Sequence, residues 1–425
     1  MLSLCIDFSR IFAADGAETF RSKPYLLLFK NLYGSKPRSD DMMKSKVSVV
    51  ICDSYDKEKV YNAVKKSIES IGGIGEFVKP DERILVKPNF LSPSESEKAI
   101  TTHPSVISAV LKILHETQYN KVKVGDSPAN GNCRAALGKL ALTDEELFGA
   151  TVADMDKEVL VKFPEGKIAN EFYYCREVTE ADAVIGLCKM KTHALERITG
   201  AVKNMYGLIC GKRKAAGHVK YPTAVNFAKM LCDIHKSTPQ RLHIMDAVVA
   251  MEGNGPSSGS PINMNMIIAS PDPVALDTVF CRLVHLNPSL VPTNVQASLV
   301  RLGTMDEKEI EIILTDGEST TVCDISELVR KYGNPDFDVV RDKDKFKTAL
   351  SIISKVTGGN RKPVIDKSKC VKCGICVDHC PVEGKAVDFV NGKTKPPVYN
   401  YKKCIRCYCC QELCPQKAIS VKGIF

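Results

Sequence analysis

The stretch from Cys370 to Pro381 reads CVKCGICVDHCP, and it decides the fold of the carboxy-terminal part of the chain. Its cysteines follow the spacing Cys-x2-Cys-x2-Cys-x3-Cys-Pro. The same spacing returns from Cys404 to Pro415, where the sequence reads CIRCYCCQELCP. Because two copies of one dense spacing are hard to obtain by chance, we interpret them as one metal-binding domain.

Thiolates are soft ligands, and a loop with this spacing lets three sulfurs from one turn bind three irons of a cubane. In two-cluster ferredoxins the fourth cysteine of each run binds the other cluster. We therefore predict two [4Fe-4S] clusters. Cluster I is assigned to Cys370, Cys373, Cys376 and Cys414, and cluster II to Cys404, Cys407, Cys410 and Cys380.

Structural zinc is the alternative to iron, because paired Cys-x2-Cys knuckles also bind zinc. Zinc needs two ligands from each knuckle, whereas each run here offers four cysteines and a proline. A fifth cysteine, Cys409, is either a spare thiol or a competing ligand, and Cys410 is preferred because it keeps both spacings. On these motifs residues 362–425 resemble the bacterial-type ferredoxin domain, which implies a small α+β fold.

The chain has 425 residues, of which 44% are apolar, enough for a large core and two or three domains. Its remaining cysteines are scattered singly through apolar segments, as is usual for buried thiols in a cytoplasmic protein. Iron–sulfur clusters also need reducing, anaerobic conditions, so we expect a cytoplasmic location. No run of about 18 apolar residues is present, so we expect no membrane span.

The formal net charge is +9, and residues 361–425 hold 13 Lys and Arg against 5 Asp and Glu. A basic cluster domain favours an acidic redox partner, such as a small ferredoxin or flavodoxin. Nucleic acid is not an expected partner, because the basic residues are not interleaved with aromatic ones and Trp is absent.

Four segments are expected along the chain. Residues 1–45 are a leader, either disordered or upstream of the true start of translation at Met42 or Met43. Residues 46–318 form the body, residues 319–361 form a charged connector, and residues 362–425 form the cluster domain.

In the body, short apolar strands alternate with amphipathic helices. This order predicts α/β layers around a mostly parallel sheet, in a body of one or two lobes. Strands are expected at 47–52, 84–86, 122–124, 183–187, 242–245 and 265–269, and helices at 57–70 and 103–117. Polar signatures follow several of these strands, and ligands of such sheets bind outside the carboxyl ends of the strands.

The most unusual stretch of the body runs from Lys189 to His218. Thr199-Gly200 is expected to open a helix whose free N–H groups and positive dipole end favour an anion. His193 can exchange a proton near neutral pH. We predict His193 and Lys203 as catalytic groups beside a carboxylate or phosphate; the alternative is a solvated basic face with a packed core histidine. The predicted substrate-binding residues are Lys87, Asn89, Asp126, Lys189, Lys191, Thr199, Gly200 and Asn204.

Further motifs accompany this stretch along the body. They are Lys87-Pro88-Asn89, Thr102-His103-Pro104, Gly125-Asp126-Ser127-Pro128, Met251-Glu252-Gly253-Asn254-Gly255-Pro256 and Ser270-Pro271-Asp272-Pro273. On these motifs residues 46–305 resemble the family known as domain of unknown function 362, whose members often carry the same ferredoxin tail. The resemblance implies an iron–sulfur redox protein with no known substrate. The loop 251–259 is expected to be flexible and to lie over the cleft.

His193 and the pattern Thr199-Gly200-x-x-Lys203 also resemble the amino-terminal domain of lactate racemase. In that family a Gly-Gly-x-Lys lysine tethers a nickel pincer cofactor. This chain departs from the Gly-Gly pattern, so the resemblance supports only an α/β body with a cleft.

Two functions remain open at this point. One is a ferredoxin-linked oxidoreductase that passes single electrons to a small anionic ligand in the body. The other is a non-enzymatic electron carrier whose body docks a partner enzyme. No Gly-x-Gly-x-x-Gly follows a strand and no Walker pattern is present, which argues against nicotinamide and ATP sites.

Overall fold

The structure is a computed structural model that describes residues 44–211, 213–341 and 361–423. The predicted leader therefore lies almost wholly outside the described residues, as does much of the predicted connector. Within the described ranges, no helix combines the length and the apolar character needed to cross a bilayer.

A ten-stranded sheet forms the centre of the body, in the order β12-β11-β1-β10-β9-β7-β2-β3-β4, with β8 paired to β7. Strands β9, β7, β2, β3 and β4 run parallel to one another, and β10 is antiparallel to both of its neighbours. The strands are β1 (Ser45–Ile51), β2 (Ile84–Lys87), β3 (Val122–Val124), β4 (Thr151–Val152), β7 (Ala183–His193), β8 (Arg197–Thr199), β9 (Gln240–Glu252), β10 (Ser260–Ser270), β11 (Ile310–Asp316) and β12 (Ser319–Cys323). The predicted mostly parallel α/β sheet is confirmed, as one continuous sheet.

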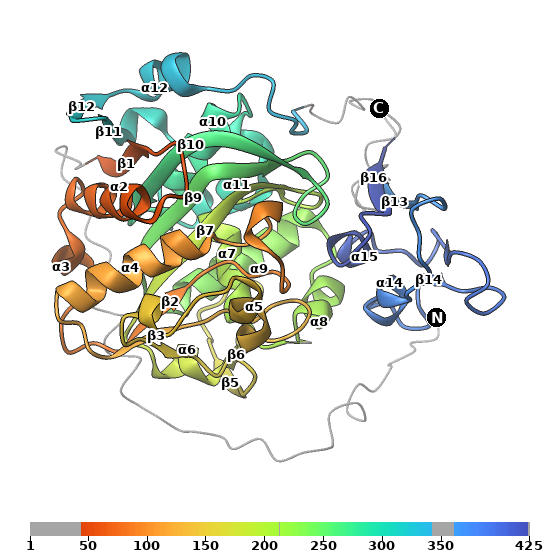
Figure 1. The fold of residues 1–425 in the computed structure, drawn as a ribbon. Helices are drawn as coiled ribbons and strands as arrows, with labels where there is room; N and C mark the ends of the chain where they lie inside the picture. Colours follow the sequence, from red (N-terminus) through yellow and green to blue (C-terminus); the bar gives the residue numbers. More distant parts are fainter. Residues whose placement is uncertain (1–43, 212, 342–360, 424–425) are drawn as a thin grey trace.

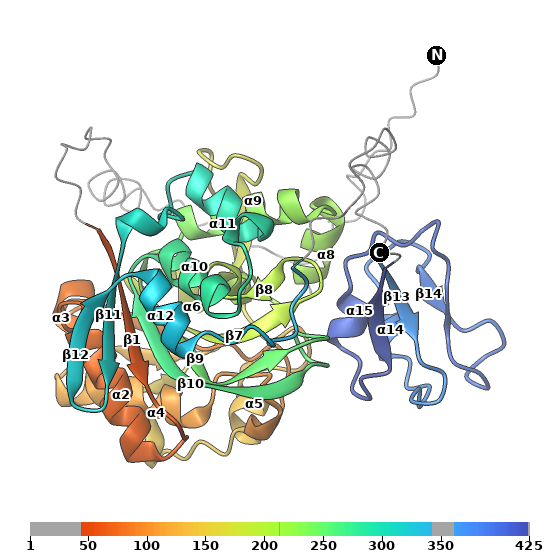
Figure 2. The ribbon, with the colours of Figure 1, turned by 90° about the horizontal axis from the view of Figure 1, so that it is seen from above.

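Helices cover both faces of this sheet (Figure 2). One face carries α2 (Lys57–Glu69), α3 (Ile74–Phe77), α4 (Pro104–Glu116) and α5 (Cys133–Lys139). The opposite face carries α9 (Ala224–Lys236), α10 (Pro273–Leu283), α11 (Pro292–Leu299) and α12 (Ile325–Tyr332). The short helix α7 (Ala201–Asn204) packs against α9 and α10. The remaining elements of the body are α6 (Arg176–Glu180), α8 (Arg213–Lys220) and the hairpin of β5 (Glu158–Lys162) and β6 (Glu171–Cys175).

Local sequence explains where the first long helices begin. Asp56 caps α2, because its side chain accepts hydrogen bonds from the N–H groups of Glu58 and Lys59. Pro104 occupies the first turn of α4, where its missing N–H costs nothing, and the His103 side chain caps that helix. Both helices bury an apolar face against the sheet, so tertiary packing fixes them in place.

The body extends beyond residue 318, where the sequence analysis ended it. Strand β12 pairs antiparallel with β11, at the edge of the main sheet. Helix α12 follows directly, with a capping box between Asp324 and Glu327 and with Ile325 and Leu328 buried. The charged residues of α12, Glu327, Arg330 and Lys331, lie on its exposed face, opposite Ile325 and Leu328.

The cluster domain is a small unit beside the body (Figure 1). Its elements are β13 (Lys362–Ile365), α14 (Ile375–Asp378), β14 (Val387–Asp388), β15 (Val398–Tyr399), α15 (Cys409–Glu412) and β16 (Ile419–Lys422). Strand β13 pairs with β16 and β14 pairs with β15, both antiparallel. The predicted small α+β fold is therefore confirmed. Helix α15 lies on the side of the domain that faces the body (Figures 1 and 2).

The loop between β9 and β10 holds the cluster domain against the body. Gln411 Nε2 donates to Asn254 O at 2.8 Å, and Asn254 Nδ2 donates to Ile419 O at 2.9 Å. The Ser257 hydroxyl donates to Glu412 O at 2.6 Å. The loop 251–259, expected to be flexible, is thus bound to the cluster domain.

Candidate functional site

The cysteines predicted to hold cluster I surround one pocket. Its wall includes Cys370, Cys373, Cys376 and Cys414. Burial, together with the neighbouring Cys373, Cys414 and Cys370, raises the pKa of Cys376 to about 11. The fourth cysteine of the second run thus lies among the first three cysteines of the first run.

The cysteines predicted to hold cluster II are also close together. Burial is the main cause that raises the pKa of Cys404, and the nearby Cys407 and Cys380 contribute. Cys410 packs in the same small core as Cys380 and Cys404. Cys380 of the first run thus lies near cysteines of the second run.

The sulfurs of these sets receive hydrogen bonds from the domain itself. Ala386 N donates to Cys380 Sγ and Ala418 N donates to Cys414 Sγ, both at 3.3 Å. The Tyr399 hydroxyl lies 3.1 Å from Cys410 Sγ. Hydrogen bonds of this kind tune the reduction potential of iron–sulfur clusters. Four thiolates for each cluster, with donors aimed at their sulfurs, fit two [4Fe-4S] clusters.

Cys409 and Cys410 point into different surroundings. Cys410 belongs to the core of the cluster domain and receives the Tyr399 hydroxyl. Cys409 lies near Tyr206 of the body. Burial is the main cause that raises the pKa of Tyr206, and Cys409 is the next. Cys409 also contacts Cys407, so the hydrogen bond from Tyr399 is the observation that favours Cys410 as the cluster ligand. Among the residues that the structure describes, no three His, Cys, Asp or Glu side chains are grouped to hold a single metal ion.

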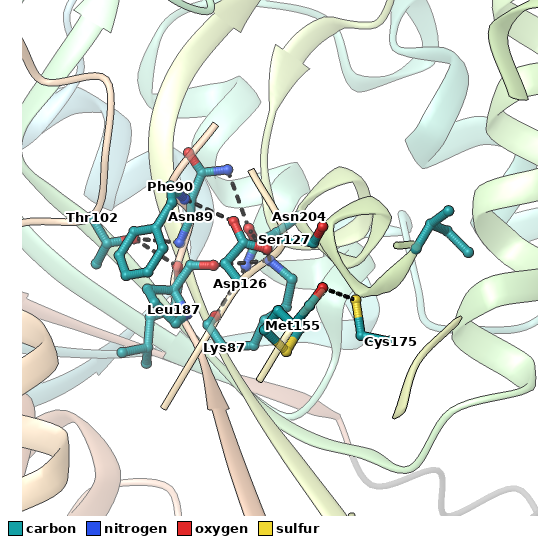
Figure 3. Close-up of polar contacts among 12 residues, drawn as sticks. Lys87, Asn89, Phe90, Thr102, Asp126, Ser127, Met155, Cys175, Leu187 and Asn204 are labelled. Carbon is teal, nitrogen blue, oxygen red and sulfur yellow. Dashed lines mark hydrogen bonds and ion pairs between the residues drawn. The ribbon is translucent and has the colours of Figure 1, made fainter. Parts of the chain in front are cut away.

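Four of the predicted substrate-binding residues bind one another instead of an open cleft (Figure 3). Lys87 Nζ lies 2.9 Å from Asp126 Oδ1, with both side chains buried. Lys87 Nζ also donates to Asn204 Oδ1 at 3.1 Å, and Asn89 Nδ2 donates to the same oxygen at 3.2 Å. Asp126 Oδ2 accepts from Phe90 N at 2.8 Å. This network joins the ends of β2 and β3 to α7.

The predicted lysines of β7 are also inside the sheet. The strand runs to His193, beyond its expected end at 187, and all of its residues are buried. Lys189 Nζ lies 2.8 Å from Asp246 Oδ2. Lys191 Nζ donates to Asn89 Oδ1 at 2.7 Å and to Ile100 O at 2.6 Å. Burial lowers the pKa of Lys191 well below its usual value, so this amine is a poor charge partner for an anion.

The prediction that Thr199-Gly200 offers free N–H groups to a ligand is wrong. Helix α7 does begin after Gly200. However, the Asp277 carboxylate accepts from Ala201 N at 2.6 Å and from Val202 N at 3.1 Å. A Cβ at Gly200 would collide with this carboxylate, so the glycine is required by the close approach of α10. A carboxyl group of the chain itself therefore occupies this helix end, and burial raises the pKa of Asp277 to about 7.

His193 lies at the end of β7, but it does not titrate near neutral pH as predicted. Its Nδ1 accepts hydrogen bonds from Leu195 N at 3.1 Å and Glu196 N at 3.0 Å. Burial, followed by the field of Lys203, lowers the pKa of His193 to about 4. Since Nδ1 is an acceptor, the neutral ring carries its proton on Nε2. That nitrogen lies 3.0 Å from Glu412 Oε1 of α15.

Lys203 faces the same region as His193. The positive charge of Lys203 lowers the pKa values of five nearby groups, which are Lys191, His193, Glu196, His218 and Glu412. Its side chain has no hydrogen-bond or ion-pair partner in the described ranges. Lys203 is therefore the one predicted catalytic residue whose charge the described chain leaves unpaired.

Sequence reasoning missed three buried polar residues around Lys203. Glu196 is fully buried, and neither of its carboxylate oxygens has a hydrogen-bond partner among the described residues. Burial raises the pKa of Glu196 to about 8 and lowers the pKa of His218 to about 4. Burial alone would raise the pKa of Glu412, but His193 and Lys203 bring it down to about 2. Glu196 and His218 lie in the stretch 189–218 and Glu412 lies in the second cysteine run, but none was predicted as a site residue, because each becomes significant only through its neighbours.

The geometry defines an α/β body joined to a dicluster ferredoxin-like domain, with polar side chains buried where the two meet. Comparison with family models agrees. Residues 84–282 match the domain of unknown function DUF362, and residues 362–415 match the 4Fe-4S dicluster domain.

The chain is also 35% identical over 269 residues to the thylakoid-associated protein sll1697 of Synechocystis sp., covering 62% of this chain and 80% of that protein. It belongs to the DUF362 family and carries a carboxy-terminal 4Fe-4S dicluster domain.

Two solved structures show more distant similarity. One is the lactate racemase apoprotein from Thermoanaerobacterium thermosaccharolyticum, with a TM-score of 0.37 and 13% identity over 59% of each chain. The other is a structural-genomics protein from Thermotoga maritima, with a TM-score of 0.34 and 12% identity over 59% of this chain and 60% of that one. The chain thus spans about three fifths of both.

Proposed function

We propose that this protein passes single electrons through two [4Fe-4S] clusters to a small anionic substrate or cofactor held in the α/β body near Lys203. The observation that carries the proposal is the contact of Glu412 with His193 at 3.0 Å. Glu412 lies in the loop of cluster II, between Cys410 and Cys414, and His193 ends the central strand β7. Cluster II is thus the cluster next to the body.

The side chains around Lys203 have separate roles in this proposal. The Lys203 ammonium supplies the positive charge for an anionic ligand, since the described chain gives it no partner. His193 positions Glu412 and stays neutral, because its Nδ1 is held by two backbone N–H groups. When bound, the clusters supply one electron each, and the buried Glu196 keeps its proton up to a pH of about 8.

One experiment compares anaerobically prepared wild-type protein with Lys203→Met and with Lys220→Met, a control on the exposed part of α8. Iron is counted, the reduced clusters are examined by electron paramagnetic resonance, and bound small molecules are identified by native mass spectrometry. We expect about eight irons per chain in all three proteins. A bound anion should be present in the wild type and the control and lost in Lys203→Met. Zinc in place of iron, or no bound anion in any protein, would overturn the proposal.

A second candidate function is electron transfer without a reaction in the body. It is favoured by the exposure of Cys373, which brings cluster I to the surface of a basic domain. In this function an acidic ferredoxin or flavodoxin docks on the cluster domain. Fast reduction by such a carrier, with no bound anion and no reoxidation by small molecules, would support it. For either function we propose a cytoplasmic location, which cell fractionation would test.

A further inference from the structure

Two cysteines that the clusters do not use lie side by side in the body. Cys175 ends β6, and Cys210 follows the short helix η4 (Met205–Leu208). Tyr174 and Ile209 form an antiparallel bridge that holds the two segments together. Cys175 Sγ lies 3.1 Å from the carbonyl oxygen of Met155 (Figure 3). Cys210 Sγ lies 3.6 Å from the same oxygen and 3.3 Å from the carbonyl oxygen of Asp156.

The two thiols have unequal surroundings. Cys175 is fully buried, whereas Cys210 is 6% exposed. The pKa of Cys210 is lowered, first by the hydrogen bond with the Cys175 thiol and further by the nearby Lys214. The pKa of Cys175 is raised, first by the same hydrogen bond and then by burial. A pair with one stabilised, more accessible thiolate and one protected thiol has the asymmetry that thiol–disulfide exchange requires.

A short polar path leads from this pair toward the cluster domain. Lys214, whose charge acts on both thiols, is the second residue of α8. Its carbonyl oxygen accepts the Tyr206 hydroxyl at 2.6 Å. Burial, then Cys409 and Glu412 of α15, raise the pKa of Tyr206 well above its usual value. Tyr206 therefore lies between the thiol pair and the loop of cluster II.

We propose that Cys175 and Cys210 form a redox-active dithiol that reduces small-molecule disulfides. We infer a small-molecule substrate because Cys210 has only a small exposed part, which a compact disulfide reaches more readily than a folded protein does. The recovery step rests on the electron transfer proposed above, but the dithiol itself does not.

The two cysteines reduce the substrate disulfide in two exchange steps. The Cys210 thiolate attacks one sulfur of the substrate, its S–S bond breaks, and a mixed disulfide forms as one thiolate leaves and takes a proton from water. Cys175 then attacks Cys210 Sγ, loses its proton to the second leaving thiolate, and closes the Cys175–Cys210 disulfide. Two single electrons from the cluster domain and two protons from solvent restore both thiols.

The first test uses the anaerobic, cluster-loaded full chain and 2-hydroxyethyl disulfide. Remaining thiols are alkylated, and crosslinked peptides are identified by mass spectrometry. We expect a Cys175–Cys210 crosslink that is lost in Cys210→Ser and retained in Cys323→Ser, a control on the distant strand β12. Absence of the crosslink in the wild type, or equal crosslinking among other body cysteines, would overturn the dithiol.

The second test follows return of the two thiols after dithionite reduces the clusters. We expect recovery to be severalfold slower in Cys410→Ala, which removes a ligand of cluster II. Equal recovery rates in the two proteins would overturn delivery through the clusters and leave the dithiol standing. Loss of the crosslink alongside normal cluster reduction in electron paramagnetic resonance would overturn the dithiol and leave the proposed electron transfer standing.

Discussion

Glu412 Oε1 lies 3.0 Å from His193 Nε2, so the helix that carries a cluster II cysteine meets the end of the central strand of the body. Both side chains are almost fully buried. This contact gives the chain a fixed relation between its electron-carrying domain and its largest sheet, and it makes the junction testable by mutation.

Removing the Glu412 carboxylate should loosen the junction. Glu412→Ala removes the buried polar partner 3.0 Å from His193 Nε2, and we expect a loss of about 1–3 kcal/mol in the stability of docking. We expect faster amide hydrogen exchange in residues 251–259 and in α15. Glu383→Ala, an exposed change in the same domain, should leave exchange unchanged. If iron content stays constant and exchange does not rise in Glu412→Ala, the contact does not stabilise docking.

The Lys87–Asp126 pair should be costly to break from one side. Lys87→Met leaves the buried Asp126 carboxylate without its cation, and we expect a loss of about 3–5 kcal/mol in the free energy of unfolding. The double variant Lys87→Met/Asp126→Asn should lose less stability than the sum of the losses in Lys87→Met and in Asp126→Asn. Lys59→Met breaks the exposed pair with Asp53 and should cost less than about 1 kcal/mol. Urea unfolding of the wild type and these four variants measures the losses. Additive losses at Lys87 and Asp126 would contradict a coupled pair.

Gly200 should be intolerant of any side chain. Gly200→Ala places a methyl group against the Asp277 carboxylate and pushes it away from α7, at a cost of about 1–3 kcal/mol. Gly138→Ala is the matched control, because no heavy atom outside its own helix lies within 4 Å of the added carbon. That change should stabilise α5 by about 0.5–1 kcal/mol. Thermal unfolding distinguishes the two, and equal effects would contradict the close packing at Gly200.

Glu196 should make stability depend on pH. Burial raises its folded-state pKa to about 8, above the value of about 4.3 in an unfolded chain. The folded state therefore binds the proton more tightly. The contribution of Glu196 to the free energy of unfolding is fully present below its unfolded-state pKa and is lost as pH rises through about 8. Between these two pKa values the free energy of unfolding falls by about 1.4 kcal/mol per pH unit.

Glu196→Gln should flatten this slope between pH 6 and pH 8, while the exposed control Glu318→Gln should keep it. Urea unfolding of the body at several pH values, followed by hydrogen exchange of β7 peptides, measures the difference. A slope that survives in Glu196→Gln would show that another group is responsible.

Much of the fold could be predicted from the sequence, because it depends on local patterns. The cysteine spacing indicated the cluster domain, and the alternation of apolar strands with helices indicated a layered α/β body. The starts of α2 and α4 follow from Asp56 and Pro104, whose effects reach only a few residues. The same local reading ended β7 too early, because Lys189 and Lys191 look like surface residues until their buried partners are known.

The sequence by itself determined which residues can act as soft ligands and which segments form strands and helices, because spacing and periodicity are properties of neighbours in the chain. Only the tertiary structure decided that Asp277 fills the helix end at Gly200, that His193 is neutral, and that Glu412 reaches it. The physical reason is that burial and pairing set charge, and both depend on residues from distant parts of the sequence that meet only on folding.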